Sequence, residues 1–126
     1  MDSIQFLEFS KKVMTFTPLD EIDYRQVVSR SYYCAFHQTS EKALSLGVPV
    51  NAYKGGTHKS LRETLISLRP ANNKLKGIAF KLNNFHIKRV ESDYKLDVCI
   101  TERTALESIQ MCDKIISDLA TITSLK

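Results

Sequence analysis

The longest helical pattern in the chain covers residues 21–46, and it constrains the fold more than any other feature. Apolar and small side chains recur there three or four positions apart, the spacing that places them on one face of an α-helix. Gly47 and Pro49 then end the pattern, because proline cannot continue a helix and glycine favours its C-terminus. One long helix with a buried face is therefore predicted. That face is formed by Ile22, Val28, Tyr32, Ala35, Phe36, Thr39, Ala43 and Leu46.

Four weaker patterns predict further helices around this one. Three of them cover residues 4–16, 57–69 and 72–94, and each ends at or near a proline or a polar connector. The last begins at Thr104, which matches a capping box with Glu107 three positions later. The buried face predicted for this helix consists of Leu106, Ile109, Cys112, Ile116 and Leu119.

The remaining segments read as connectors. The run KLDVCI is the only β-like stretch, and GVPVNAYKGGTH holds three of the four glycines and predicts a surface loop. A chain of 126 residues with 43% hydrophobic residues is long enough for one domain with a real core. We therefore predict a single domain over residues 1–126, an all-α fold in the form of an up-and-down bundle of about five helices.

Composition limits the cellular location and the kinds of ligand to be expected. The chain has 18 Lys and Arg and 14 Asp and Glu, so its formal net charge is +4. This charge suits a polyanionic partner and is also common among unrelated proteins. The three cysteines are far apart, and the three histidines have no metal-ligand spacing. No run approaches eighteen apolar residues. We expect a cytoplasmic protein without a metal, a cofactor or a membrane span.

The central helix carries an unusual polar stripe. Arg30, Tyr33 and His37 share a face, because seven residues turn a helix almost twice, with a rise of roughly 10 Å between the ends. This face points away from the predicted core. It is either a solvated surface with incidental polar residues or a site where arginine holds a phosphate and histidine moves a proton.

Lysines form a second stripe on the predicted helix over residues 72–94. Lys74, Lys81, Lys88 and Lys95 recur every seven positions. They could follow a nucleic-acid backbone, or they could simply keep the helix surface soluble.

The inward face of the same helix turns polar toward its end, at His86, Arg89 and Asp93. These groups either approach the site on the central helix, or Asp93 pairs with Arg89 four residues earlier. His58 stands at a predicted helix start, where we expect it to cap the helix or face solvent.

Two segments resemble HEPN domains. SRSYYCAFHQTSEKAL is similar to their central helix, whose motif is an arginine, a few variable residues and a histidine, here Arg30, six residues and His37. HIKRVESDYKLD is similar to the segment ending in Ala-Asp-Tyr that closes a late helix in many members, with serine in the alanine's place before Asp93 and Tyr94. THKSL is a looser third match. Many ribonuclease members have Asn, Asp or His after the arginine, and this chain has Ser31.

The resemblance implies a short helical bundle that forms a symmetric homodimer, in which two central helices bring both copies of Arg30 and His37 into one cleft. It also implies a metal-independent endoribonuclease, in which the 2′-hydroxyl of RNA attacks the phosphate. His37 would move protons and Arg30 would stabilise the phosphate charge, so both are assigned as catalytic. Substrate binding is assigned to Tyr33, Lys81, Lys88 and Arg89, and a supporting role to Ser31, Asp93 and Tyr94.

The resemblance also suggests partners and alternatives. A ribonuclease of this kind would act on RNA as the toxin beside a nucleotidyltransferase-like antitoxin. One branch of the family carries a tyrosine two positions after the histidine that its antitoxin modifies, and Thr39 occupies that place here. The alternative is a catalytically inactive HEPN module that binds a nucleotide or a partner protein. A third reading is a helical scaffold in which Tyr33 and Leu44 only form a dimer seam.

Overall fold

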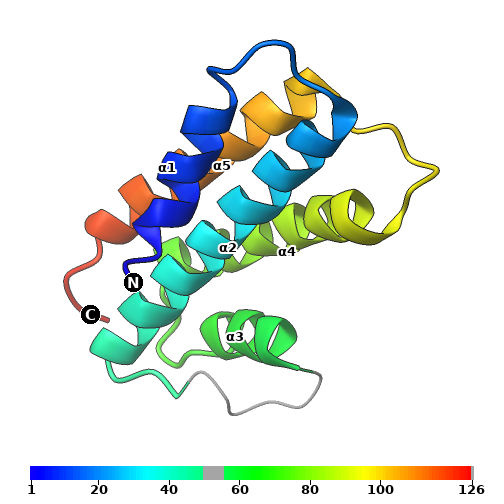
Figure 1. Cartoon of the computed structure of the whole chain (residues 1–126). Helices are drawn as coiled ribbons and strands as arrows, with labels where there is room; N and C mark the ends of the chain where they lie inside the picture. The colour runs from blue at the N-terminus through cyan, green and yellow to red at the C-terminus, as the bar shows by residue number, and fades with distance from the viewer. Residues whose placement is uncertain (50–55, 126) are drawn as a thin grey trace.

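The structure is a computed structural model that describes residues 1–49 and 56–125, and these residues form helices without any strand (Figure 1). The all-α prediction is therefore confirmed for the described part of the chain. KLDVCI forms a connector, and residues 50–55 of the predicted glycine-rich loop lie outside the described residues. The helices are α1 (Ile4–Val13), α2 (Glu21–Ser45), α3 (Thr57–Ile66), α4 (Asn73–Tyr94) and α5 (Glu102–Ala120).

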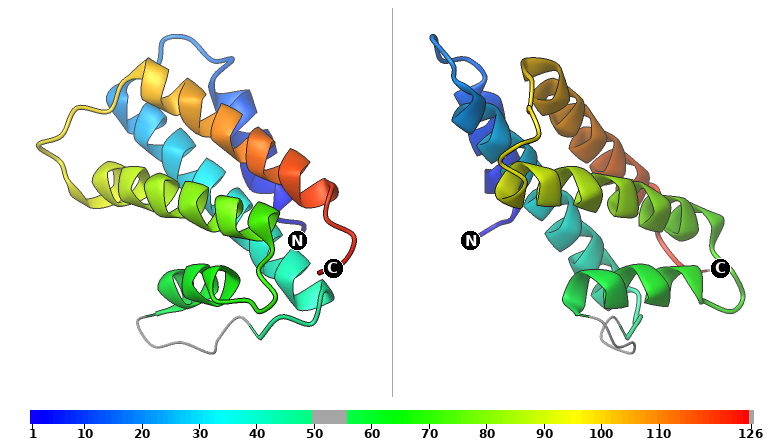
Figure 2. Two further views of the ribbon diagram at one scale, coloured as in Figure 1. Left: turned by 180° about the vertical axis from the view of Figure 1, so that it is seen from behind. Right: turned by 90° about the vertical axis from the view of Figure 1, so that its right-hand side faces the viewer.

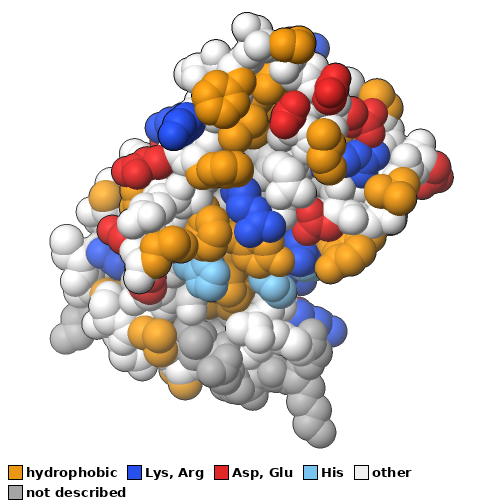
Figure 3. All heavy atoms as spheres, in the orientation of Figure 1, with side chains coloured by type: hydrophobic (Ala, Val, Ile, Leu, Met, Phe, Trp, Pro, Cys, Tyr) orange, Lys and Arg blue, Asp and Glu red, His pale blue; other side chains and the backbone are white. Residues whose placement is uncertain are grey.

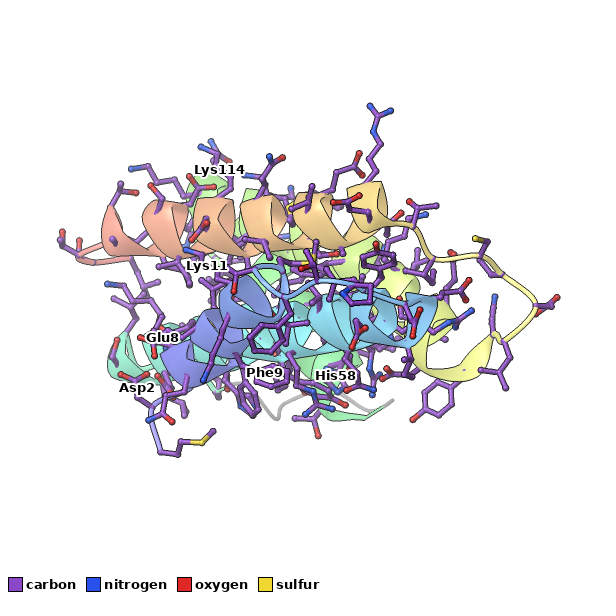
Figure 4. The ribbon with its side chains drawn as sticks, turned by 45° about the horizontal axis from the view of Figure 1, so that its top comes forward. Asp2, Glu8, Phe9, Lys11, His58 and Lys114 are labelled. Atoms are coloured by element: carbon purple, nitrogen blue, oxygen red, sulfur yellow. The ribbon has the colours of Figure 1, made fainter. Side chains whose placement is uncertain are left out.

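The long helix α2 is the centre of the bundle and packs against α1, α4 and α5. The chain runs alternately up and down through these four helices, while α3 lies beside α4 near the C-terminal end of α2 (Figures 1 and 2). An ion pair of 3.1 Å between Lys11 and Asp113 joins α1 to α5, and Figure 4 shows Lys11 between these two helices. None of the described helices has the length and apolar character needed to cross a membrane.

The core follows most of the predicted face of α2. Val28, Tyr32, Ala35, Phe36, Thr39 and Ala43 are buried, whereas Leu46 is partly buried. The prediction for Ile22 is wrong, because its side chain is 59% exposed. At this end of the helix the inward position belongs to Arg25, which is 6% exposed.

Arg25 caps the C-terminal end of α4. Its guanidinium donates hydrogen bonds to the backbone oxygens of Glu91 at 3.1 Å, Ser92 at 2.9 Å and Lys95 at 3.3 Å, and also to that of Val98. The last carbonyls of a helix have no partner within the helix, so a buried donor at this place stabilises the helix end. Arg25 therefore holds α2 and the α4–α5 connector together.

Helix ends differ from the predicted ones by a few residues. The first helix ends at Val13 and the third at Ile66, three residues earlier than expected. The fifth begins at Glu102, and the N–H of Thr104 donates to Thr101 Oγ1 at 3.2 Å. Thr101 is thus the N-cap, and the predicted capping box of Thr104 is wrong.

The buried face of α5 is shifted as well. Leu106 is 43% exposed and Ile116 is only partly buried, contrary to the prediction. Small side chains take the inward places in the first turns and let α5 approach α2 closely. The buried residues of α5 are Ala105, Ser108, Cys112, Ile115 and Leu119.

Candidate functional site

Arg30, Tyr33 and His37 lie together on one face of α2, as the spacing predicted. His37 is exposed, while Arg30 and Tyr33 are partly buried. Phe6 of α1 completes this surface, because its ring stacks on that of His37 with centroids 6.0 Å apart and planes inclined by 18°. We call these four residues the Arg30–His37 face.

The rings of Phe6 and Tyr33 both lie against Arg30 and His37. The guanidinium carbon of Arg30 lies 5.4 Å from the ring centroid of Tyr33 and 5.9 Å from that of Phe6. The ring of His37 stacks on Tyr33 as well, with centroids 6.3 Å apart. Within the described residues Arg30 forms no salt bridge. Its charge is therefore positioned by cation–π contacts and is free to bind an anion.

Arg89 of α4 contacts the Arg30–His37 face through Tyr33. It donates a hydrogen bond to the Tyr33 hydroxyl, and its Nε lies 3.0 Å from Oδ2 of Asp93. Ser29 donates to the same carboxylate oxygen at 3.2 Å. The Arg89–Asp93 ion pair is present, and Arg89 also reaches the site, so both alternatives for this segment hold at once. Tyr94 is 69% exposed and lies against Arg89, with the guanidinium carbon 5.7 Å from its ring centroid.

A second group of basic side chains lies next to this face, between α3 and α4. It consists of His58, Arg62, His86 and Arg89, and we call it the basic cluster. The rings of His58 and His86 have centroids 5.2 Å apart, and Nδ1 of His58 is 2.7 Å from the hydroxyl of Tyr32. Figure 3 shows histidine side chains beside Lys and Arg side chains on one face, bordered by hydrophobic ones.

Burial and crowding of positive charge control the titration of this cluster. The pKa of His58 is lowered to about 4, first by burial and then by the charges of His86, Arg89, Arg62 and His37. The pKa of His86 is lowered as well, first by burial and then by Arg62 and Arg89. Both imidazoles are therefore neutral at pH 7 in the isolated protomer.

Tyr32 orients the ring of His58. Its hydroxyl lies in the core, and burial raises its pKa, so it remains protonated. A neutral imidazole accepts a hydrogen bond through one nitrogen and carries its proton on the other. With the Tyr32 hydroxyl donating to Nδ1, the proton of His58 resides on Nε2, which remains available as a donor.

The titration of His58 predicts a pH-dependent stability. Its pKa is about 4 in the folded chain against an ordinary value of 6.5, so the unfolded state binds more protons between these values. The full contribution to stability is present above pH 6.5 and is lost as the pH falls toward 4. After allowance for solvent screening of this half-buried group, the loss should be on the order of 1 kcal/mol.

Urea unfolding of the wild type and of His58→Asn at several pH values measures this contribution. Asn keeps an acceptor for Tyr32 and does not titrate, so we expect a flatter profile below pH 6.5. Parallel profiles for the two proteins would assign the pH dependence to other groups.

Three assigned residues do not join the site. Lys81 contacts α5, where its Nζ lies 2.7 Å from Oδ2 of Asp118. Lys88 lines a groove against α5 of about 200 Å³, together with Glu107 among others. Ser31 is fully buried and donates to Ser10 Oγ of α1 at 3.0 Å, so its supporting role at the site is wrong and it serves the α1–α2 contact instead.

Several residues at the site were not predicted from the sequence. Phe6 belongs to the apolar pattern of the first helix, and Arg62 shows no periodic signal of its own. His86, in contrast, lies on the polar end of the inward face of α4, for which approach to the site is one of the two predicted alternatives. His58 neither caps α3 nor faces solvent fully, because it is partly buried against Tyr32 and Phe36, with ring centroids 5.5 and 4.3 Å apart. Figure 4 shows His58 at the edge of the molecule away from α5. Only the presence of three histidines in one short chain hinted at this cluster.

The donor set at the site contains nitrogen and hydroxyl groups. Among the residues that the structure describes, no group of three or more His, Cys, Asp or Glu side chains is placed to hold a metal ion. Comparison of the chain with protein-family models, with curated proteins and with solved structures gives no match.

Proposed function

We propose that the protein is an endoribonuclease of the HEPN type, which cleaves RNA without a metal ion at the Arg30–His37 face. One observation carries this proposal: an exposed imidazole and a guanidinium that forms no salt bridge among the described residues lie against the same two aromatic rings, those of Phe6 and Tyr33. These are the two groups that proton transfer and phosphate stabilisation require. The resemblance of this segment to the HEPN motif points to the same chemistry.

The proposed reaction begins with the 2′-hydroxyl of the substrate. His37 accepts its proton while the 2′-oxygen forms a bond to phosphorus, and Arg30 stabilises the negative charge on the pentacoordinate phosphate. The bond from phosphorus to the 5′-oxygen then breaks, and that oxygen receives a proton. The products are a 2′,3′-cyclic phosphate and a 5′-hydroxyl end.

Aromatic side chains suit a single-stranded substrate. Bases stack on aromatic rings with little dependence on sequence, and the partly buried rings of Phe6 and Tyr33 contact both proposed catalytic groups. Their ring centroids are 6.3 Å apart, so both rings border the imidazole. The formal charge of +4 favours binding of the phosphate backbone.

A homodimer is part of the proposal, because one protomer offers only one imidazole at the face. Two copies of His37 in a shared cleft would allow one to accept the 2′ proton and the other to donate to the 5′-oxygen. Exposed apolar side chains accompany the stripe, with Leu44 of α2 59% and Phe9 of α1 47% exposed. Apolar surface of this kind is typical of a protein interface.

Sedimentation at micromolar concentration tests the assembly. We expect a dimer, and we expect Leu44→Glu to shift it toward the monomer, because a charge buried at an apolar interface is costly. Arg103→Glu on the far side of α5 is the control, since Arg103 is exposed and pairs only with Glu107 on its own helix. A wild-type protein that remains monomeric would remove the shared cleft.

The function itself is tested by incubating the purified protein with single-stranded RNA in excess EDTA. We expect cleavage to persist with the chelator, because the proposed groups are side chains of the protein alone, and to weaken steeply as salt rises. Loss of cleavage with EDTA that returns with added divalent metal would contradict the mechanism. If no RNA is cut and a nucleotide or protein binds saturably, the inactive HEPN module is the better function.

The resemblance also names a class of protein partner. A ribonuclease of this type would be the toxin of a pair, and we propose a nucleotidyltransferase-like antitoxin as the protein that restrains it.

A further inference from the structure

The basic cluster holds more positive charge than its surroundings neutralise. Three of its side chains contact Tyr32 of α2: the ring centroids of His58 and His86 each lie 5.5 Å from that of Tyr32, and the guanidinium carbon of Arg89 lies 5.9 Å from it. The charge of Arg62 acts on Tyr32 and on both histidines. Only one carboxylate, that of Asp93, forms an ion pair in this cluster within the described residues, and it pairs with Arg89.

Three nitrogen atoms of the cluster are buried without a hydrogen-bond partner in the part of the chain that the structure describes. They are Nη1 of Arg62, Nδ1 of His86 and Nε of Arg89, whose 3.0 Å contact with Asp93 is an ion pair without hydrogen-bond geometry. Within the same residues Arg62 forms no salt bridge. A buried donor without an acceptor is costly, and such groups are rare in folded proteins unless a ligand completes them. The cluster therefore lacks an acceptor.

The donors of the cluster define the chemistry of that missing group. Arg62 and Arg89 are donors only, and His58 presents an Nε2–H in the tautomer in which the Tyr32 hydroxyl donates to Nδ1. A ligand that matches them has several acceptor oxygens, carries negative charge and needs no donor of its own. A phosphate group has these properties, and arginine binds it in a planar, charge-assisted geometry.

The cluster adjoins the proposed site of cleavage. Phe36 is the link, because its ring centroid lies 5.3 Å from that of His37 and 4.3 Å from that of His58. Tyr33 also contacts both sides, since Arg89 donates to its hydroxyl and Arg30 lies over its ring. The Arg30–His37 face and the basic cluster are therefore neighbouring surfaces that one strand could contact together.

We propose that His58, Arg62 and His86, with the charge of Arg89, bind a backbone phosphate of RNA next to the scissile one. This inference rests on the proposed function and adds a second phosphate position to it. The cluster aligns the strand for attack, and it does not take part in the bond changes. Its occupation by an anion also offsets the positive charges of Arg62 and Arg89.

The test compares Arg62→Gln with Arg103→Gln, a matched change at an exposed arginine of α5. Binding is measured with a short RNA whose 2′-hydroxyls are all methylated, so that it cannot be cut. We expect Arg62→Gln to weaken binding about 10-fold, as expected for loss of a charged hydrogen bond. The slope of log affinity against log salt should fall by about 0.7, the value for one phosphate on a single strand.

Cleavage distinguishes this inference from the proposed function. A dinucleoside monophosphate contains only the scissile phosphate, so Arg62→Gln should cut it at the wild-type rate and cut a longer RNA about 10-fold more slowly at subsaturating substrate. Equal losses on both substrates would overturn the second phosphate position. If the wild type cuts neither substrate, the ribonuclease proposal fails. The second phosphate position is then tested by the binding comparison alone.

Two further binding measurements complete the test. His86→Asn should weaken binding of the methylated RNA in the same direction, which keeps the test available if Arg62→Gln does not fold. Inorganic phosphate should compete with the RNA only weakly. If phosphate alone binds as tightly as the RNA, or if Arg62→Gln and Arg103→Gln bind RNA equally well, the cluster is not a subsite for the RNA strand.

Discussion

Replacement of Arg25 by Met is expected to lower the free energy of unfolding by about 3–5 kcal/mol, the range for breaking a buried charged network. The side chain is 6% exposed, and its guanidinium is the donor for four backbone carbonyls at the end of α4 and in the α4–α5 connector. Methionine preserves most of the apolar volume and removes every donor. The loss would therefore measure the unpaired carbonyls together with the lost ion pair to Glu21, at 2.7 Å, and not a cavity.

Chemical denaturation monitored by circular dichroism gives this value. Arg103→Met is the matched control, because Arg103 is exposed and contacts only Glu107, and its effect should be within about 0.5 kcal/mol. A change of less than about 1 kcal/mol in Arg25→Met would show that water replaces the guanidinium at the end of α4.

Replacement of His37 by Ala, and separately of Arg30 by Ala, is expected to lower the RNA cleavage rate by about 10²- to 10⁴-fold, the contribution of a positioned acid–base or charge-stabilising group. The melting temperature should change little, since His37 is exposed and Arg30 has only ring contacts on the surface. Single-turnover cleavage and thermal unfolding are measured on the same preparations.

Three outcomes of this experiment are distinguishable. Arg103→Ala should cleave at the wild-type rate, which controls for a general loss of positive charge. Unaltered cleavage in both site variants would remove the catalytic assignment. A large loss of stability in either variant would give the pair a structural role, with Phe6 and Tyr33 as its packing partners.

The central helix could be predicted well because its apolar pattern is long and its polar stripe obeys the same geometry. Positions seven apart on one helix must share a face, so the proximity of Arg30 and His37 needed no tertiary information. The prediction for Ser31 was wrong for a related reason. Adjacent helical residues point about 100° apart, and here that turn directs Ser31 into the contact with Ser10 of α1.

Residues from other helices could not be predicted in this way. Phe6 and His58 reach the site because α1 packs on α2 and α3 packs on α4, and pairwise packing leaves no period in the sequence. The lysine stripe is the opposite case, a clear period whose residues do not join the site. Periodicity alone cannot distinguish a helix face that meets solvent from one that meets a neighbouring helix. Lys81 pairs with Asp118 of α5, and this contact lowers the pKa of that carboxyl.

The start of α5 shows how a small error in a helix end changes a predicted core. Thr101 and Thr104 are both suitable N-caps, and their hydroxyls lie only 3.2 Å apart. A choice between them needs the position of α5 against α2. With the cap at Thr101, Ala105 is buried and Leu106 lies on the outer surface.

The most direct test of ribonuclease action at the Arg30–His37 face uses two RNAs that differ by one atom. One carries the 2′-hydroxyl at the cut position, and the other carries a 2′-deoxy sugar there. Mass spectrometry of the products, in excess EDTA, should show a 2′,3′-cyclic phosphate from the first RNA and no cut at that position in the second. Cutting of both at equal rates, or products with 3′-hydroxyl and 5′-phosphate ends, would contradict attack by the 2′-hydroxyl and with it the roles of Arg30 and His37.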